Sequence, residues 1–442
     1  MIDRTAAWMA EAAGARLVSG DPEATGARRA VTDSREAGPG DLFVGVPGAR
    51  ADGGEFAPDT LRAGAWGVLV AERHAERGAA AAPQGAAVLA AADPVAALGA
   101  LARAWRRELG CPAIGVTGST GKTSTKDILA ALLAPRLRTH ANRENLNTEI
   151  GLPLALLDAP RGTQVLVLEM AMRGEGQIAE LAAIAEPEVG VIVNVGPVHL
   201  ELLGTVERVA AAKAELIRDL PAGASCVIPA GEPLLDAYVR DDLDTIGFGP
   251  GGDVRLERFE GGRAQIDARG TPVTLELPYS EPHNLMNTLA AVAAATAVGV
   301  VPGGRVEPHF SSMRGELVEL PGGVTVVNDC YNANPMSMRA ALDHLAASPA
   351  ERRIAVLGEM AELGPDAERF HTDVGGHAQD VGIDVLVTVG EPAVAIATGF
   401  DGETYPVADP EEAGALLAEL AQPGDRVLIK GSRSVGLERV LA

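Results

Sequence analysis

The sequence has few cysteines, few aromatic residues and a shortage of positive charge. Its three cysteines, Cys111, Cys226 and Cys330, form an odd, widely spaced set that fits neither a disulfide framework nor a zinc site. Aromatic residues make up only 3% of the 442 residues, so the hydrophobic cores must consist mainly of alanine, valine and leucine. The formal net charge of −23 argues against a nucleic-acid-binding surface, although a small anionic ligand needs only local positive charge.

Long apolar segments are also absent from the sequence. No apolar run is long enough to span a bilayer, and the stretch MIDRTAAWMAEAAG carries charges where a signal peptide has its apolar core. We therefore expect a cytoplasmic protein in a reducing compartment, with no membrane span and no nucleic-acid partner. At ~150 residues per domain, the length is enough for about three domains.

Short apolar runs indicate an α/β fold with mostly parallel sheets. Most of these runs lack alternation, as expected for parallel strands covered on both faces, and Ala- and Leu-rich helical segments lie between them. Residues 253–278 do alternate and carry a Gly-Gly turn, so we expect antiparallel strands at a sheet edge there. The non-alternating predicted strands are 41–46, 66–70, 113–118, 165–170, 189–196, 325–329, 353–360, 384–390 and 426–431.

Two loop-like stretches divide the chain into three predicted domains. A helical segment ends in Gly-Cys-Pro near residues 108–112, and the segment 303–315 is rich in glycine, proline and polar residues. The predicted domains are an N-terminal domain over 1–110, a central domain over 111–312 and a C-terminal domain over 313–442.

The strongest local signal is a phosphate-binding loop. The predicted strand 113–118 runs into Gly118, Ser119, Thr120, Gly121, Lys122, Thr123 and Ser124, and a helix follows. In such a loop backbone N–H groups surround an anion at the helix N-terminus, the lysine contacts the β- and γ-phosphates, and the threonine hydroxyl holds Mg²⁺. Val116 stands where the strict pattern has glycine, so this is a shorter variant. A glycine-rich turn without a ligand is the alternative, but strand, glycines, lysine and threonine occur in the required order.

Charged residues follow the predicted strands at the sheet edge where ligands collect. Glu169 ends one such strand, and its carboxylate could reach a second Mg²⁺; a solvent-facing glutamate is the alternative. His199 follows the next strand, and a lone histidine is more often structural than a ligand. Together with Lys213 these residues form a candidate cluster opposite the phosphate loop.

Lys213 breaks the pattern of the predicted helix 205–217. It lies on the apolar face, where leucine would fit, and its neighbours are small alanines. Three interpretations are open. The stem could lie along the apolar face with the ammonium in water, the charge could pair with Glu207 or Glu215, or burial could lower the pKa so that the amine becomes modified.

Asparagines and an aspartate could contact a nucleotide base or ribose. Asn284 and Asn287 face one way at the start of a predicted helix, where asparagine can contact an adenine edge or cap the helix. Asp329 and Asn332 follow the predicted strand 325–329. Each of these signals is weak alone.

Basic residues outside the phosphate loop are candidates for contacts with anionic groups. Arg314 lies between the second and third predicted domains and would reach phosphates only if those domains close. The segment KGSRS at 430–434 ends the last predicted strand with two positive charges and hydroxyl groups.

From about residue 30 to the end, the chain resembles the Mur ligases. The phosphate loop alone is not specific, but the combination of segments is, and it is most similar to members that add D-alanyl-D-alanine to UDP-N-acetylmuramoyl-tripeptide. The segments, in chain order, are DSREAGPGDLFVGVPGARADGGEFAPDTLRAGA, TGSTGKTS, NLNTEIG, LEMAMRGEGQI, HLELLGT, AKAEL, HNLMNTLAAVAAA, DCYNANPMSM, LGEMAELG and KGSRS.

The resemblance implies an architecture and a reaction. It implies a small N-terminal α/β domain for the UDP group, a central P-loop ATPase domain with a mostly parallel sheet, and a C-terminal Rossmann-like domain that closes over ATP. The reaction would form an amide through an acyl phosphate during cytoplasmic peptidoglycan precursor synthesis. Partners would be UDP-N-acetylmuramoyl-tripeptide and D-alanyl-D-alanine, with ATP and two Mg²⁺ ions, and we expect a monomer.

The resemblance also assigns roles to individual residues. Lys122, Glu169, His199, Arg314 and a carbamylated Lys213 would be catalytic, and Thr123, Glu169, His199 and Lys213 would bind metal. Carbamylation means that a neutral amine adds CO₂, which turns a cation into an anion able to bind Mg²⁺. The ATP contacts would be the phosphate loop residues 118–124 with Asn284, Asn287, Arg314, Asp329 and Asn332. The substrate contacts would be Ser34, Arg35, Asn145, Asn147, Thr148, Glu149, Lys430, Ser432 and Arg433.

Three alternatives remain at this stage. One is another ligase of the same superfamily that adds a single amino acid, although the Asp-Asn-Pro-Arg segment usual there is absent. A nucleotide-dependent switch is a second, but no asparagine precedes a lysine, as guanine recognition would require. A scaffold with a degenerate phosphate loop is the third, and the last two predict no acceptor-dependent ADP release.

Overall fold

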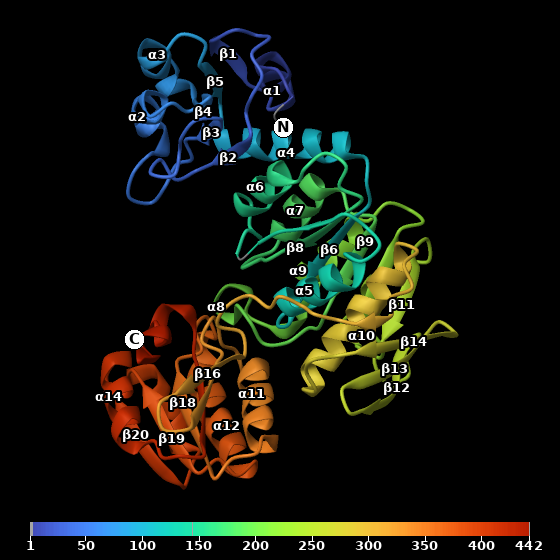
Figure 1. Cartoon of the computed structure of the whole chain (residues 1–442), viewed down its shortest axis with the longest axis vertical. Coiled ribbons are helices and arrows are strands. Elements are labelled where there is room, and N and C mark those ends of the chain that lie inside the picture. Colours follow the sequence, from blue (N-terminus) through green and yellow to red (C-terminus); the bar gives the residue numbers. More distant parts are fainter. Residues whose placement is uncertain (1–2, 144, 442) are drawn as a thin grey trace.

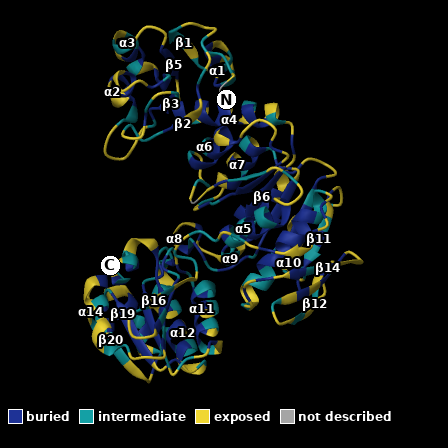
Figure 2. Cartoon of the chain, in the orientation of Figure 1, coloured by how far each residue is buried: buried dark blue, intermediate teal, exposed yellow. Residues whose placement is uncertain are grey.

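The protein, as a computed structural model, is described for residues 3–143 and 145–441. Its strands form three sheets that follow one another along the chain, and Figure 1 shows three lobes in the same order. Buried residues fill the middle of each lobe around the strands (Figure 2). The α/β class with mostly parallel sheets is thus confirmed. Each sheet lies within one predicted domain range, and the domain boundaries themselves stay predictions.

The N-terminal lobe contains a five-stranded sheet in the order β1-β5-β4-β3-β2, parallel except for β1. Its strands are β1 (Arg16–Ser19), β2 (Arg29–Val31), β3 (Asp41–Val44), β4 (Gly67–Ala71) and β5 (Ala87–Ala91). Its helices are α1 (Ala6–Ala12), α2 (Ala57–Arg62) and α3 (Glu72–Ala81).

Helix α4 (Pro94–Leu109) joins the N-terminal and central lobes. The Asp93 side chain caps its first turn by accepting from two backbone N–H groups, and Gly110 ends it in the left-handed region, with φ of 62°. Although the sequence assigns α4 to the first domain, it packs on helices α6 (Gly151–Asp158) and α7 (Gln177–Ala185) of the central lobe.

The central sheet has ten strands in the order β15-β14-β13-β12-β11-β10-β9-β6-β8-β7. Strands β6 to β11 run parallel, and β12, β13 and β14 extend the sheet as antiparallel strands, as predicted for 253–278. The strands are β6 (Ala113–Thr117), β7 (Thr139–Ala141), β8 (Val165–Glu169), β9 (Val189–Ile192), β10 (Ser225–Pro229), β11 (Asp244–Phe248), β12 (Val254–Glu260), β13 (Arg263–Ala268), β14 (Thr271–Glu276) and β15 (Gly304–Arg305).

Helices cover both faces of the central sheet, which explains why its strands are apolar without alternation. Val165 and Val167 of β8 pack in the core under α5 (Lys122–Leu133) and α10 (Pro282–Ala297). Leu166 and Leu168 point the other way, into the core with α7 and α9 (Val206–Asp219). The short helix α8 (Leu200–Leu203) precedes α9.

The C-terminal lobe has a six-stranded sheet in the order β16-β17-β21-β18-β19-β20, parallel except for β16. Its strands are β16 (Glu316–Leu320), β17 (Val324–Asn328), β18 (Arg352–Gly358), β19 (Val385–Val389), β20 (Glu403–Val407) and β21 (Asp425–Lys430). Its helices are α11 (Pro335–Ala347), α12 (Ala367–Asp380), α13 (Val394–Thr398) and α14 (Pro410–Leu420).

Candidate active site

The phosphate loop turns tightly between β6 and α5. Gly121 caps the helix in the left-handed region, with φ of 75°, and a Cβ atom there would lie 2.5 Å from the Asn287 side-chain oxygen. Lys122 Nζ donates to the Gly118 carbonyl oxygen at 2.9 Å, so the lysine folds back over the loop. The first backbone N–H groups of α5 are therefore available to an anion, as the sequence predicted.

Asn194 holds this loop in place, and the sequence did not point to it. Its Oδ1 accepts from the backbone N–H groups of Ser119 and Thr120 at 3.1 and 2.9 Å, and its Nδ2 donates to the Thr120 carbonyl at 3.1 Å. Ser119 adds a hydroxyl bond to the Gly196 carbonyl at 3.1 Å. The segment after β9 thus shapes the anion site, although one polar residue in a loop gives no sequence signal.

The strand order explains why Glu169 and His199 lie beside the phosphate loop. β6 is flanked by β9 and β8, so the residues that follow these three parallel strands meet at one sheet edge. Glu169 is 1% exposed, and one of its oxygens accepts from Asn147 Nδ2 at 2.8 Å. Its other oxygen, Oε2, is buried and has no hydrogen-bond partner among the described residues.

An orphaned carboxylate oxygen in a buried site fits a magnesium ligand. A buried acceptor without a partner is costly, and Mg²⁺ prefers carboxylate oxygens. Thr123, on the first turn of α5, is also buried. The residues present therefore suit the predicted Mg²⁺ ion. Asn147, which was predicted to contact the substrate, also orients the Glu169 carboxylate.

Lys213 is buried, with 2% of its surface exposed. Burial lowers its pKa well below the ordinary value, and the charge of Lys122 lowers the pKa further. The first two interpretations of this residue lose their support. The ammonium does not reach water, while Glu215 accepts from the backbone N–H groups of Gly176 and Ala179 at 2.6 and 3.0 Å. Glu207, the other candidate partner, lies in an exposed position.

His199 contacts Glu362, a residue of the C-terminal lobe that the sequence did not single out. His199 Nδ1 hydrogen-bonds to the Glu362 carboxylate. Both backbones are in the left-handed region, with φ of 54° and 62°, and Glu201 N donates to the Glu362 carbonyl at 3.1 Å. Burial lowers the pKa of His199; Glu362 opposes this, while Lys122 and Lys213 add to it. The contact with Glu362 holds the imidazole at Nδ1 and leaves Nε2 for a metal ion.

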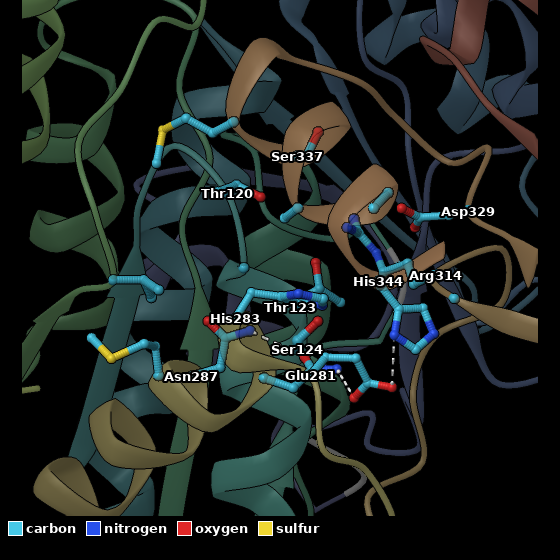
Figure 3. A pocket seen from close by; sticks show the side chains of 18 of the residues that line it. Thr120, Thr123, Ser124, Glu281, His283, Asn287, Arg314, Asp329, Ser337 and His344 are labelled. Carbon is cyan, nitrogen blue, oxygen red and sulfur yellow. Dashed lines mark hydrogen bonds and ion pairs between the residues drawn. The ribbon is translucent and has the colours of Figure 1, made fainter. Parts of the chain in front are cut away.

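A cavity of about 690 Å³ opens between the central and C-terminal lobes (Figure 3). It brings together residues from α5, α10 and the end of β17, which were predicted to contact the nucleotide, and it adds Lys430 from the end of β21. Arg314 lies with its guanidinium 4.2 Å from the centre of the Tyr331 ring. The predicted residues that line the cavity are Ser119, Thr120, Gly121, Lys122, Thr123, Ser124, Asn284, Asn287, Arg314, Asp329, Asn332 and Lys430.

The sequence missed an ion pair across this cavity. Glu281, at the start of α10, lies with its carboxylate 3.7 Å from His344 Nδ1 of α11, and Figure 3 shows the two side chains facing each other. Glu281 also accepts from Asn284 Nδ2 at 3.3 Å. Burial lowers the pKa of His344, and Glu281 opposes this shift. Glu281 of the central lobe and His344 of the C-terminal lobe therefore face each other in the lining of the cavity.

The three residues predicted to face the incoming peptide lie in different environments. Lys430 lines the cavity and pairs with Asp329 at 2.5 Å, because β17 and β21 are neighbours. Ser432 is 3% exposed, and its hydroxyl accepts from the Ala361 N–H at 2.9 Å. Arg433 is exposed and lies 3.2 Å from Glu438.

The predicted substrate residues in the first half of the chain do not line the cavity. Ser34 and Arg35 lie in the N-terminal lobe, where Arg35 pairs with Asp33. Asn145, Thr148 and Glu149 are exposed in the segment between β7 and α6. The structure thus places the predicted nucleotide residues around one cavity and leaves Ser34 and Arg35 in another lobe. Asn145, Thr148 and Glu149 lie next to Asn147 in the chain, and Asn147 contacts Glu169.

The fold and the site together define an enzyme class. Parallel sheets from two lobes point their carboxyl ends at one cavity, which is lined by the phosphate loop, Arg314 and Lys430. The buried Glu169 carboxylate ends β8, the strand next to β6. This is the arrangement of a nucleotide-dependent enzyme of the P-loop type.

Comparisons with known proteins narrow the class. The Mur ligase middle domain matches residues 116–295, and the Mur ligase, glutamate ligase domain matches residues 313–433. A UDP-N-acetylmuramoyl-tripeptide–D-alanyl-D-alanine ligase from Bacillus subtilis is 34% identical, over 100% of this chain and 98% of the relative. One from Synechocystis sp. is 38% identical, over 93% and 90%. The chain belongs to the Mur ligase family.

Solved structures agree with this assignment. MurF from Acinetobacter baumannii superposes with a TM-score of 0.87 at 29% identity, covering 99% of this chain and 97% of the other. MurF ligase from Thermotoga maritima in complex with ADP superposes with a TM-score of 0.80 at 33% identity, covering 94% and 96%. Among the described residues, no helix is long and apolar enough to cross a membrane.

Proposed function

We propose that the chain is an ATP-dependent, ADP-forming ligase that joins D-alanyl-D-alanine to the terminal carboxylate of UDP-N-acetylmuramoyl-tripeptide. The names of its full-length relatives support this function. The observation that carries it is the buried Glu169 carboxylate beside the phosphate loop, with one free oxygen and with Asn147 of the NLNTEIG segment on the other. This contact links the nucleotide site to the segment expected to meet the peptide substrate.

The reaction proceeds in two steps. A carboxylate oxygen of the tripeptide attacks the γ-phosphorus of ATP, the bond to the bridging oxygen breaks, and ADP leaves. The amine of D-alanyl-D-alanine then attacks the carbonyl carbon of the acyl phosphate and loses a proton, and phosphate leaves with the former carboxylate oxygen. Lys122 and Arg314 supply positive charge where two anions must meet, which is the main electrostatic task of such a site.

Two Mg²⁺ ions fit the donor set proposed for this site. Thr123 and Glu169 would hold one, and Glu169, His199 and a carbamylated Lys213 would hold the other. When bound, the ions would neutralise charge on the phosphate oxygens. Carbamylation suits Lys213 because burial and the charge of Lys122 lower the pKa of its amine, which favours the neutral form that adds CO₂.

The other predicted substrate residues complete the proposal. Ser34 and Arg35 would bind the UDP group in the N-terminal lobe, and Asn145, Thr148 and Glu149 would meet the sugar-peptide. Domain closure would bring these groups to the nucleotide. The protein would act as a monomer in the cytoplasm, during peptidoglycan precursor synthesis.

An acceptor assay tests the proposed function. Purified protein is incubated with ATP, Mg²⁺ and UDP-N-acetylmuramoyl-tripeptide, and phosphate release is measured with D-alanyl-D-alanine, meso-diaminopimelate or lysine. The tripeptide is supplied in two forms, ending in meso-diaminopimelate or in lysine. We expect release only with D-alanyl-D-alanine. Release only with a single amino acid would favour the related ligase that adds one residue, and acceptor-independent release would contradict both.

A further inference from the structure

Lys126 is a buried lysine that the proposed reaction does not use. It lies on α5 one turn beyond Lys122 and is 3% exposed. Its Nζ donates to the Asn142 carbonyl oxygen at 2.9 Å and pairs with Asp127 at 2.8 Å. An apolar side chain of similar size could fill this space with no loss of stability, so the polar pair calls for another explanation.

On one side, Lys126 supports the end of β8. Asn142 is 1% exposed, and its Oδ1 accepts from the Glu169 N–H at 2.8 Å. Its Nδ2 donates to the Glu169 carbonyl at 3.1 Å and to the Leu146 carbonyl at 2.7 Å. Asn147, which follows Leu146 in the chain, donates to the Glu169 carboxylate at 2.8 Å. Lys126 therefore holds the residue that fixes both Glu169 and the start of the NLNTEIG segment.

On the other side, Asp127 holds the linker to the C-terminal lobe. Its Oδ2 accepts from the Ser311 N–H at 3.2 Å and from the Ser311 hydroxyl at 3.4 Å. Ser311 lies three residues before Arg314 in the segment between β15 and β16. The adjacent residues Lys126 and Asp127 thus connect α5 with two segments more than 160 residues apart in the chain.

We propose that Lys126 and Asp127 are positioning residues. They fix the NLNTEIG segment and the segment that carries Arg314 relative to α5, the helix that follows the phosphate loop. This inference rests on the proposed function, because it is that reaction which requires carboxylate, triphosphate and Arg314 to meet within bond-forming range. A satisfied buried network is rigid, so it can hold these parts in one geometry. Neither residue touches the reacting atoms; each acts through Asn142 or Ser311.

Lys126→Met, Asp127→Asn and a matched control, Arg106→Met, test this proposal. Arg106 is also a buried cation, 5% exposed, that donates to the Ala185 carbonyl at 2.8 Å and pairs with Glu188 at 2.7 Å. Glu188 comes directly before β9, so this pair lies at the amino end of the parallel strands, whereas the phosphate loop lies at their carboxyl ends. A purely structural role predicts that Lys126→Met and Arg106→Met behave alike.

Amide hydrogen exchange of the full chain is the primary readout, since it reports local opening without activity. In Lys126→Met, we expect amides at 145–149 and 168–170 to exchange at least tenfold faster. In Asp127→Asn, we expect faster exchange at 310–313, because the single amide oxygen of asparagine cannot accept from both Lys126 and Ser311. Arg106→Met should leave all three segments unchanged.

Kinetics give a second readout. The KM for UDP-N-acetylmuramoyl-tripeptide should rise at least tenfold in Lys126→Met and stay unchanged in Arg106→Met, while the dissociation constant for ADP stays within threefold. Unchanged exchange in all three segments, or equal KM values for Lys126→Met and Arg106→Met, would overturn the proposal. If Lys126→Met does not fold, unchanged exchange at 310–313 in Asp127→Asn overturns it. If wild-type protein forms no product but the exchange changes occur, the proposed function fails while the structural linkage stands.

Discussion

The substitution Lys213→Met distinguishes between two roles of this residue, a purely structural one and that of a carbamylated metal ligand. Methionine has a similar length, and the lysine lies at 2% exposure on the apolar face of α9. Burying the polar end of this side chain costs free energy whether it is an amine or a carbamate, so the apolar replacement should leave the melting temperature unchanged or raise it. Losing a metal ligand, by contrast, should lower kcat at least 100-fold, which corresponds to about 2.7 kcal/mol of transition-state stabilisation.

The assay follows phosphate release at saturating substrates, with and without added bicarbonate. Bicarbonate should not restore activity to Lys213→Met or Lys213→Ala, whereas a short carboxylate such as formate should partly restore Lys213→Ala, where the truncated side chain leaves room. Carbon-13 NMR with labelled bicarbonate should show a carbamate signal in wild type that both variants lack. Full activity in Lys213→Met or Lys213→Ala would refute the carbamate.

Three further predictions concern the phosphate loop, the histidine contact and pH. Gly121→Ala should weaken ADP binding more than tenfold in calorimetry. The left-handed backbone at this position costs a non-glycine residue ~1–2 kcal/mol, and the new Cβ would meet the Asn287 side chain. An unchanged affinity for ADP would count against this account of the phosphate loop. Glu362→Ala should weaken Mn²⁺ binding 10- to 100-fold, because His199 loses its orienting partner. Electron paramagnetic resonance measures this affinity, and a wild-type value would exclude that role for Glu362. Burial lowers the pKa of His140, so the unfolded state binds the extra proton and stability should rise with pH until about 6.5 and then level. His140→Gln should reduce this slope in urea titrations, while His199 and His344 keep their share of it, and an equal slope would contradict the assignment.

The sequence predicted the parts of the site that depend on regular structure. Parallel strands place their carboxyl ends at one edge, so Glu169 and His199 could be expected beside the phosphate loop before the strand order was known. Lys213 was identifiable because it interrupts an apolar helix face. The strands that the sequence missed include β7, with three residues, and β15, with two, and runs this short carry no periodic signal.

The contacts that the sequence missed join distant segments. Asn194 shapes the phosphate loop from 75 residues away, and Glu362 reaches His199 across 163 residues. Such pairs depend on how the sheets and lobes are placed, and nothing local marks a loop asparagine or glutamate as a partner. At Ser432, whose substrate contact stays a prediction, nothing in the sequence indicated that the hydroxyl accepts from the Ala361 N–H.

Oxygen-isotope transfer tests the central claim most directly. UDP-N-acetylmuramoyl-tripeptide labelled with ¹⁸O in its terminal carboxylate is incubated with protein, ATP, Mg²⁺ and D-alanyl-D-alanine, and the released phosphate is analysed by mass spectrometry. An acyl phosphate predicts one ¹⁸O atom in each phosphate and one amide product for each ADP. Unlabelled phosphate, formed by attack of water on ATP, would contradict the account.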